Sequence, residues 1–366
     1  MERIVIHSDL NNFYASVERK LHPELSGVPL AVGGNKEERK GIVLAKSEEA
    51  KKFGVKTGET LWQAKKKCPD LVVVPPHFNE YMKYSRLARG IYAEYTDLIE
   101  PYGIDECWLD VTRSTKIFPK FAGDMYVGEG ENRHFAPEYL TFLGDTLRER
   151  VKGELGITVS VGVSFNKVFA KLGSDLKKPD GTTVIPVSEY KAKLYALSVG
   201  DLLYVGKATA EKLKRRGIST IGALANAPDE LVHGLLGKMG DTLLKYARGL
   251  DDEEVRPMGE SGELKSIGNS LTYPRDLTAF DEVKRNLFVL AESVAARLRE
   301  ADLGRADTVH LWVRDSNLKS LSAQKKVRPT VLCGEIANHA FALFCERVKP
   351  PFKVRTLGVT VSGFDN

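Results

Sequence analysis

The feature that most constrains the fold is a pair of adjacent carboxylates between a turn and a strand. Asp105 and Glu106 follow the turn-forming Gly103 and precede the apolar run Cys107-Trp108-Leu109. This pattern predicts a strand that begins at the acidic pair, near a sheet edge or a cleft. Like charges this close raise each other's pKa unless a cation offsets them, and a hard divalent ion with oxygen ligands does so. Because neighbours in a regular strand point to opposite faces, both carboxylates can serve one metal cluster only if the backbone bends at or just after Gly103. A lone Asp-Glu dipeptide is more often a charged turn between strands, so the rest of the chain decides.

A third carboxylate ends the first predicted strand. The apolar segment 4–8 leads into Asp9, and a helix begins near Phe13, with Asn11 or Asn12 available as its N-cap. Asp9 should therefore lie at the rim of a sheet, unless it serves only as a helix-capping residue. A phosphatase of the Asp-x-Asp type would need a second acid where Asn11 stands.

The length and the composition bound the class of protein. A chain of 366 residues is long enough for two or more domains. It has no long uncharged apolar run and opens on a strand, which predicts a soluble, intracellular protein. The four cysteines are scattered, without zinc-type or disulfide-type spacing.

The last hundred residues form a basic module. From Lys265 onward, 16 Lys and Arg stand against 11 Asp and Glu, which accounts for the whole net charge of +5. The order strand, helix, strand, strand, helix, strand predicts a four-stranded sheet with both helices on one face. The other face and the edges are free to meet a polyanion.

The segments between these regions alternate strands and helices. We expect a strand at 41–46, a basic helix closed by Gly54, helices at 60–68, 81–98 and 140–152, strands at 72–74 and 157–163, and an irregular excursion at 117–137. Lys167 and Lys171 lie four apart on one predicted helix face, which is either solvated or, beside carboxylates, able to clamp phosphates. Residues 203–213 are similar to a helix-hairpin-helix element, although Tyr204 stands where a first glycine is usual and only Gly206 remains.

In their order and spacing, these motifs resemble the Y-family of translesion DNA polymerases, of the bacterial polymerase IV type. The resemblance runs nearly the whole chain and is carried by Asp9 with segment 13–18, by segments 49–55 and 104–106, by 166–179, by the hairpin at 203–213 and by 265–268. It implies an α+β multidomain, right-hand polymerase. Its predicted parts are a palm (1–12 and 78–182), small fingers (13–77), a helical, helix-hairpin-helix-like thumb (183–250), a linker (251–264) and a four-stranded α/β little finger that binds DNA (265–366).

The resemblance also implies a function and a set of site residues. The enzyme would be a low-fidelity, template-directed DNA polymerase in translesion synthesis, working as a cytoplasmic, nucleoid-associated monomer on primer-template DNA and deoxynucleoside triphosphates. Two Mg²⁺ ions, for which Mn²⁺ can substitute, would be held by Asp9, the Leu10 carbonyl, Asp105 and Glu106. The nucleotide would contact Phe13, Tyr14, Ala45, Lys51 and Lys178, with Tyr14 as the steric gate against ribose, and DNA would contact Gly206, Lys207, Lys325, Lys326 and Arg328.

Several residues depart from the family's pattern. The family commonly has Asp, Tyr and Arg where this chain has Asn11, Glu48 and Lys51. Lys51 can replace a planar guanidinium only as a point charge, and Glu48 would repel phosphate if it pointed inward. Ile42 and Leu44 are bulkier than the residues usual over the nascent base pair, which predicts a tighter site.

A sliding clamp is a further expected partner. The chain stops at Phe364-Asp365-Asn366, without the Gln- and Leu-Phe-containing tail of many relatives. Either the sequence is truncated or the clamp contact lies elsewhere.

Two other functions remain open on the sequence. A DNA-binding repair scaffold on a degenerate polymerase fold is suggested by Glu48, Lys51 and Tyr204, and the three carboxylates with Lys178 argue against it. A nucleotidyl cyclase shares the palm, but it would need a Gly-Gly-Asp-Glu-type turn, which this chain lacks. A cyclase would also have no need for a thumb.

Overall fold

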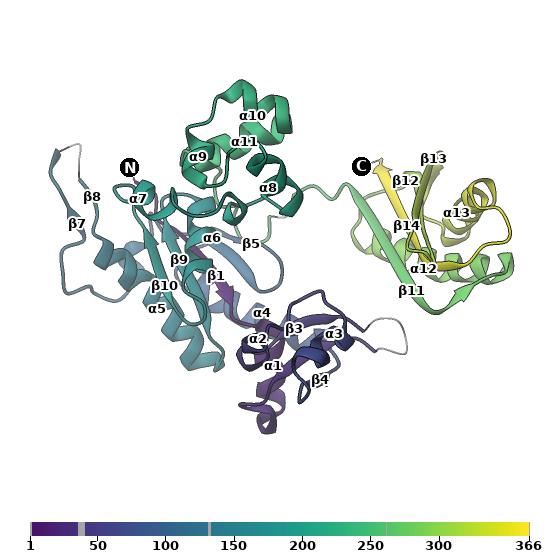
Figure 1. Ribbon diagram of the computed structural model, residues 1–366, viewed down its shortest axis with the longest axis horizontal. Coiled ribbons are helices and arrows are strands. Elements are labelled where there is room, and N and C mark those ends of the chain that lie inside the picture. Colours follow the sequence, from purple (N-terminus) through teal and green to yellow (C-terminus); the bar gives the residue numbers. More distant parts are fainter. Residues whose placement is uncertain (1, 36–40, 131–132, 261, 366) are drawn as a thin grey trace. The chain divides into compact units, whose positions relative to one another are not determined.

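The computed structural model describes residues 2–35, 41–130, 133–260 and 262–365 (Figure 1). The strands of the first 260 residues are β1 (Val5–Leu10), β2 (Leu30–Gly33), β3 (Val43–Lys46), β4 (Val72–Val74), β5 (Ile99–Pro101), β6 (Glu106–Asp110), β7 (Tyr126–Val127), β8 (His134–Phe135), β9 (Val159–Ser164) and β10 (Thr182–Ile185). The α-helices are α1 (Phe13–Leu21), α2 (Glu48–Lys52), α3 (Leu61–Lys67), α4 (Phe78–Ala93), α5 (Pro137–Leu155), α6 (Lys167–Leu176), α7 (Tyr190–Leu194), α8 (Lys207–Lys214), α9 (Ile221–Ala225), α10 (Asp229–Leu236) and α11 (Lys238–Ala247). The short 3₁₀ helices are η1 (Pro23–Leu25), η2 (Thr115–Ile117) and η4 (Val199–Asp201).

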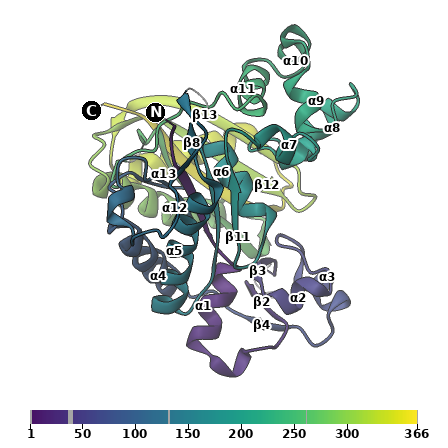
Figure 2. The same cartoon turned by 90° about the vertical axis from the view of Figure 1, so that its left-hand side faces the viewer.

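A five-stranded sheet in the order β10-β9-β1-β6-β5 forms the centre of the N-terminal part. Helices α4 and α5 pack on one face and α6 on the other (Figure 2). The approach of α6 to β9 requires a glycine, because a Cβ at Gly162 would lie only 1.9 Å from the Ala170 carbonyl oxygen. Trp108 on β6 also donates to the Lys167 carbonyl oxygen over 2.9 Å. These contacts fix the helix against the strands that carry the acidic residues.

A smaller sheet in the order β3-β2-β4 follows α1. Its helix α3 begins with a reciprocal capping box, in which the Thr60 hydroxyl accepts from the Gln63 amide and the Gln63 side chain accepts from the Thr60 amide. Gly54, with φ +77°, follows α2 where the sequence predicts that the basic helix closes. The strand and helix pattern expected for this segment is therefore present.

Five α-helices, α7 to α11, pack around a core of their own. Its fully buried members include Leu194, Leu213, Ile221, Leu224 and Val232. Phe169 and Leu172 of α6 belong to the same core, so the helix that faces the central sheet also supports this helical subdomain.

The C-terminal part has the predicted architecture. It consists of β11 (Ser266–Leu277), α12 (Phe280–Glu300), β12 (Ala306–Asp315), β13 (Ser320–Thr330), α13 (Cys333–Arg347) and β14 (Val354–Phe364), with the strand order β11-β14-β12-β13. Both helices and the inward residues of the strands form one apolar core. It includes Leu290 of α12, Phe344 of α13, Val309 of β12 and Val359 of β14. Within residues 262–365, no helix lies on the opposite face of the sheet (Figure 1).

Two local expectations are wrong. Segment 117–137 is not wholly irregular, because β7 and β8 pair as a short antiparallel hairpin; residues 131 and 132 lie outside the described residues. Neither Asn11 nor Asn12 caps α1 with its side chain. Asn12 stands at the N-cap position in the left-handed region, φ +47°, and its side chain bonds elsewhere.

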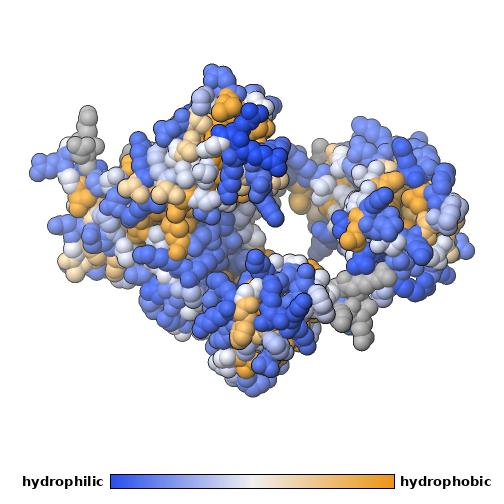
Figure 3. Space-filling view, in the orientation of Figure 1, coloured by the Kyte–Doolittle hydropathy of each residue, from blue (hydrophilic) through white to orange (hydrophobic). Residues whose placement is uncertain are grey.

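The face of the molecule seen in Figure 3 is mostly polar. In the view of Figure 3, apolar side chains are scattered among hydrophilic ones. Among the described residues, no helix combines the length and the apolar character needed to cross a membrane.

Candidate active site

Neighbouring strands of the five-stranded sheet bring the predicted acidic residues together. β1 pairs antiparallel with β6, and Asp9 stands directly opposite Glu106. Next to this pair, the Leu10 amide donates to the Asp105 carbonyl oxygen over 3.0 Å. Directly opposite residues of an antiparallel pair project to the same face, with Cβ atoms about 5 Å apart. Residues distant in sequence therefore meet at the end of β1.

The bend expected at or just after Gly103 is present. Gly103 has φ +88°, a conformation that glycine adopts without steric cost. Asp105 lies in the bend that follows, and the strand begins only at Glu106. The two side chains are thereby released from the strict alternation of a strand.

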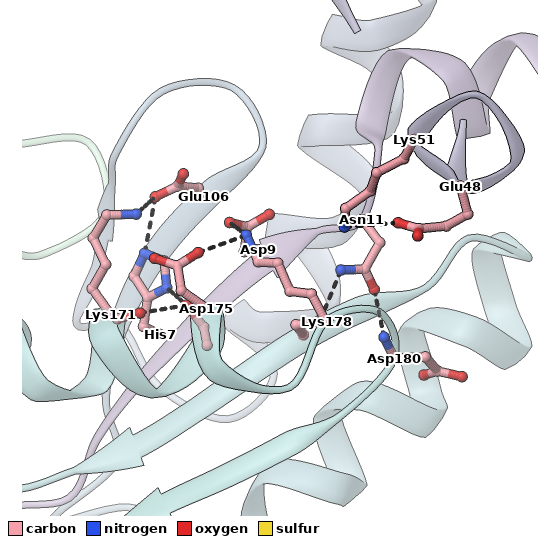
Figure 4. Close-up of polar contacts among 12 residues, drawn as sticks. His7, Asp9, Asn11, Glu48, Lys51, Glu106, Lys171, Asp175, Lys178 and Asp180 are labelled. Atoms are coloured by element: carbon pink, nitrogen blue, oxygen red, sulfur yellow. Dashed lines mark hydrogen bonds and ion pairs between the residues drawn. The ribbon is translucent and has the colours of Figure 1, made fainter. Parts of the chain in front are cut away.

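Each of the two paired carboxylates is bound by a lysine of α6 or of the loop that follows it (Figure 4). The Lys178 ammonium lies 2.5 Å from Asp9 Oδ2 and 2.8 Å from Asp175 Oδ1. The Lys171 ammonium donates to Glu106, and His7 Nε2 lies 3.2 Å from the same carboxylate. His7 is fully buried and lies on the same face of β1 as Asp9.

The surroundings shift the pKa values of the three carboxyl groups in different directions. Burial is the main influence on Asp9 and raises its pKa to about 6, in spite of the charge of Lys178. Burial, followed by the charge of Glu106, raises the pKa of Asp105. Burial also opposes ionisation of Glu106, but hydrogen bonds from His7 and Lys171 outweigh it and lower its pKa to about 2. Perturbed carboxyl groups clustered in one cleft are typical of a functional site.

The donor chemistry fits a hard divalent cation, although the carboxylates are not gathered around one point. Among the described residues, no group of three or more His, Cys, Asp and Glu side chains is arranged to hold a metal ion. The reason is that Lys178 and Lys171 bind Asp9 and Glu106 individually. Carboxylate oxygens that already attract two ammonium groups are the ligands that Mg²⁺ prefers. A divalent cation binding here would have to take the place of the lysines.

The aromatic ring of Tyr14 is held in a stack. It lies parallel to Tyr81, with ring centroids 4.2 Å apart, and meets the edge of Phe78. Tyr81 is fully buried and donates its hydroxyl hydrogen to the buried Glu18 carboxylate, which also bonds to His77. The position of the ring is therefore set by contacts with α4 and not by α1 alone.

A cavity of about 200 Å³ opens beside Asp9. It is lined by Asp9, Asn11, Asn12, Lys46, Glu48, Lys51 and Lys178. The predicted nucleotide residues Lys51 and Lys178 are thus brought together. Phe13 and Ala45 are not part of the lining; the Phe13 ring is buried against Tyr14 and Tyr81, and Ala45 is half-buried in β3.

The structure explains the departure at Asn11. Its side chain is buried, donates to Ser160 Oγ over 2.8 Å and accepts from the Asp180 amide over 2.9 Å (Figure 4). An amide can donate and accept at once, which an ionised carboxylate cannot. Asn11 therefore ties the end of β1 to β9 and to the loop that carries Lys178.

The sequence predicts that the basic face of α6 is either solvated or able to clamp phosphates, and Lys167 does neither. This lysine is buried, with its ammonium 2.8 Å from Glu100 and 3.1 Å from Glu253. It is therefore neither solvated nor placed to clamp a phosphate. Lys171 faces the cleft but is bound to Glu106.

The hairpin-like segment is reduced to a short form. The helix before the turn is only the 3₁₀ helix η4, and α8 follows with Gly206 at its N-cap. Tyr204 occupies the place of the missing glycine in a left-handed conformation, φ +65°. Gly206 and Lys207 lie at the exposed start of α8.

The three predicted DNA-binding residues of β13 divide between the two faces of the C-terminal sheet. Lys325 pairs with Val309, whose side chain lies in the core beneath the helices, and Lys326 pairs with Thr308. Lys325 and Val327 face the core side, so Lys326 between them projects from the open face, and Arg328 is exposed where the register against β12 shifts. Lys326 lies 3.1 Å from Asp307.

Sequence reasoning missed two residues of the site. His7 could have been found by alternation, because it precedes Asp9 by two positions on a strand and shares its face. Lys46 lines the cavity, and its place two positions before Glu48 carried no recognisable pattern.

Comparisons with known proteins cover the whole length. A profile of the impB/mucB/samB family matches residues 8–175, and one of the impB/mucB/samB family C-terminal domain matches residues 264–366. DNA polymerase IV of Acetivibrio thermocellus is 48% identical over 363 residues, covering 99% of this chain and 86% of the relative. DNA polymerase IV 1 of Bacillus subtilis is 38% identical over 363 residues, covering 98% and 81%.

Solved structures agree with the sequence comparisons. The Y-family DNA polymerase chimera Dbh-Dpo4(243-245)-Dbh is similar with a TM-score of 0.84 at 25% identity, over 99% of both chains. The insertion ternary complex of Dbh DNA polymerase has a TM-score of 0.65 at 26% identity, again over 99% of both chains.

Proposed function

This chain belongs to the impB/mucB/samB family of Y-family DNA polymerases, and from that premise we propose that Asp9, Asp105, Glu106 and the Leu10 carbonyl hold two divalent metal ions during nucleotide addition. The protein is a low-fidelity, DNA-directed DNA polymerase of translesion synthesis, as its relatives and structural neighbours indicate. It binds primer-template DNA and nucleotides. The identity of the metal as Mg²⁺, with Mn²⁺ as a substitute, is part of the proposal.

The pairing of Asp9 with Glu106 across β1 and β6 is the observation that carries the proposal. When bound, two divalent cations would lower the pKa of the primer 3′-hydroxyl and neutralise charge on the triphosphate. The raised pKa of Asp9 supports the same assignment, because a buried carboxylate near other acidic groups favours any cation that offsets its charge.

The remaining residues would orient the nucleotide. Lys178 and Lys51 line the cavity from two sides and would donate to the triphosphate oxygens. The stacked ring of Tyr14 would lie under the sugar and exclude a 2′-hydroxyl, because Tyr81 and Phe78 leave it no room to turn aside.

The experiment is primer extension by Asp105→Asn. This change keeps the size of the side chain and removes its charge, so extension in Mg²⁺ should fall below detection. Affinity for primer-template DNA should stay within a few-fold of the wild-type value. Retained extension by the purified variant would remove Asp105 from the metal site.

Asp97→Asn is the matched control. Asp97 lies just before β5 on the same sheet, is exposed and loses the same charge. Its extension rate should equal that of the wild type. A loss of activity in both variants would point to a general effect of charge and not to the acidic cluster.

The two other functions considered from the sequence are not favoured. A repair scaffold would bind DNA without extending it, whereas the relatives along the full chain are DNA polymerases. The helical subdomain α7 to α11 and the C-terminal sheet have no use in a nucleotidyl cyclase. We further propose that the enzyme acts as a monomer in the cytoplasm and that a sliding clamp recruits it to primed DNA.

A further inference from the structure

The cavity beside Asp9 contains a carboxylate that belongs to none of the proposed metal ligands. Glu48 is the first residue of α2, the helix that also carries Lys51. Ser47 Oγ accepts from the Ala50 amide at the start of this helix, which fixes its first turn. The side chain of Glu48 is thereby placed in the lining of the cavity, together with Lys46, Lys51 and Lys178.

Glu48 accepts hydrogen bonds from two donor side chains that line the cavity. Asn12 Nδ2 donates to Glu48 Oε1 over 2.9 Å, and the Lys51 ammonium lies 3.4 Å from the same oxygen. Asn12 is held in a left-handed conformation directly after the strand that ends at Leu10. One carboxylate oxygen therefore joins the segment after β1 to the cation of α2 (Figure 4).

These donors are the ones a triphosphate would use. Phosphate oxygens accept hydrogen bonds from ammonium and amide groups just as a carboxylate oxygen does. A phosphate that approaches Lys51 competes with Glu48 for the ammonium group, and the negative charges of phosphate and carboxylate repel each other as long as the carboxylate stays. The i, i+3 pair with Lys51 is partly exposed and hence weak, so the exchange is reversible.

We propose that Glu48 is a positioning residue that holds Asn12 and Lys51 in the nucleotide-free site and competes with the triphosphate for them. The inference rests on the proposed polymerase function of this cavity. An incoming nucleotide binds only as far as it displaces the Glu48 carboxylate, and pyrophosphate leaves more readily because the carboxylate returns. Glu48 therefore weakens nucleotide binding and favours product release.

The test is Glu48→Gln, which keeps the length of the side chain and an oxygen for Asn12 but removes the charge. The KM for the incoming deoxynucleotide should fall by about fivefold or more, and the inhibition constant of pyrophosphate should fall in parallel. Binding is also measured without chemistry, by titrating a deoxynucleoside triphosphate into enzyme on a dideoxy-terminated primer. The dissociation constant should fall by the same factor.

Glu49→Gln is the matched control. Glu49 is the next residue of the same helix, loses the same charge and is bound to Arg19 instead of facing the cavity. Its KM and dissociation constant should stay at the wild-type values. An unchanged or raised KM in Glu48→Gln overturns the inference, and so does an equal fall in both variants. If wild-type enzyme binds nucleotide but does not extend the primer, the proposed function fails while the binding comparison still decides the role of Glu48.

Discussion

Tyr14 shows how a single residue depends on neighbours that are distant in the sequence. Its ring is stacked on Tyr81, and Tyr81 is fixed by the buried Glu18, which lies one turn after Tyr14 in α1. A buried carboxylate that accepts two hydrogen bonds is costly to leave unsatisfied, so this arrangement resists movement of the ring. A gate that works by steric exclusion needs such rigidity.

Replacement of Tyr14 by alanine should remove the gate. Because the excluded 2′-hydroxyl would then meet open space, ribonucleotide incorporation should rise by about a hundredfold or more relative to deoxynucleotide incorporation. The measurement is the ratio of kcat/KM values for the two sugars with the same base.

Tyr14→Phe separates shape from hydrogen bonding. It keeps the stacked ring and loses only the hydroxyl, so sugar discrimination should stay close to that of the wild type. If Tyr14→Ala leaves the ratio unchanged, or if Tyr14→Phe changes it as much as the alanine variant does, the ring is not a steric gate.

At the scale of the element, β13 shows how basic residues that are consecutive in the sequence alternate between the two faces of a sheet. The cluster Lys325-Lys326-Val327-Arg328 is continuous in sequence, but its register against β12 sends Lys325 to the helix side and Lys326 to the open face. The open face also carries Trp312 stacked with Arg314 and a row of hydroxyl groups, including Thr356 and Ser362. Such a face suits contact with a phosphate backbone.

Neutralising Lys326 and Arg328 to alanine should reduce the salt dependence of DNA binding. If each cation contacts one phosphate, the slope of log K against log salt should become less steep by about 2. The measurement is the affinity for primer-template DNA over a range of salt concentrations.

Lys325→Ala provides the internal control on the same strand. It removes one charge from the other face, so the slope should stay at the wild-type value. An unchanged slope in the double variant would show that the open face is not the duplex contact.

Helix α6 illustrates the limit of pattern reading for an element. Lys167 and Lys171 share a helix face that periodicity describes correctly, but periodicity does not say what faces it. In the fold, Glu100 of β5 and Glu253 bind Lys167, and Glu106 binds Lys171. Breaking a buried pair of this kind typically costs about 3–5 kcal/mol, so Lys167 supports the structure.

At the scale of the molecule, the C-terminal domain has a core of its own. The inward residues of its four strands pack with α12 and α13 in one apolar cluster, and its sheet consists of the four strands of this domain. A separate core of this size is what an independently folding domain requires.

Residues 264–366 should therefore fold alone. We expect one cooperative thermal transition, a free energy of unfolding of about 5 kcal/mol or more, and weak, salt-sensitive binding to duplex DNA. Circular dichroism and dispersed amide NMR signals would check the fold. A non-cooperative transition would show that the core depends on the rest of the chain.

Local patterns predicted most of the architecture. The four-stranded C-terminal sheet, the opening strand and the helix expected at 60–68 follow from periodicity and from terminal residues, and these depend on near neighbours in the chain. The short β7–β8 hairpin was missed because two residues per strand are too few to alternate visibly. Asn12 takes the predicted N-cap position of α1, but its side chain does not cap the helix because it bonds to Glu48, far along the sequence.

The sequence by itself determined which residue types are available: carboxylates at the ends of two strands, a tyrosine near the first, and lysines on a later helix. Only the tertiary structure decided their pairing, with Lys178 on Asp9, Lys171 and His7 on Glu106, and Glu48 on Asn12 and Lys51. The physical reason is that hydrogen bonds and charge interactions act over a few ångströms in space, whereas a sequence pattern reports only separation along the chain.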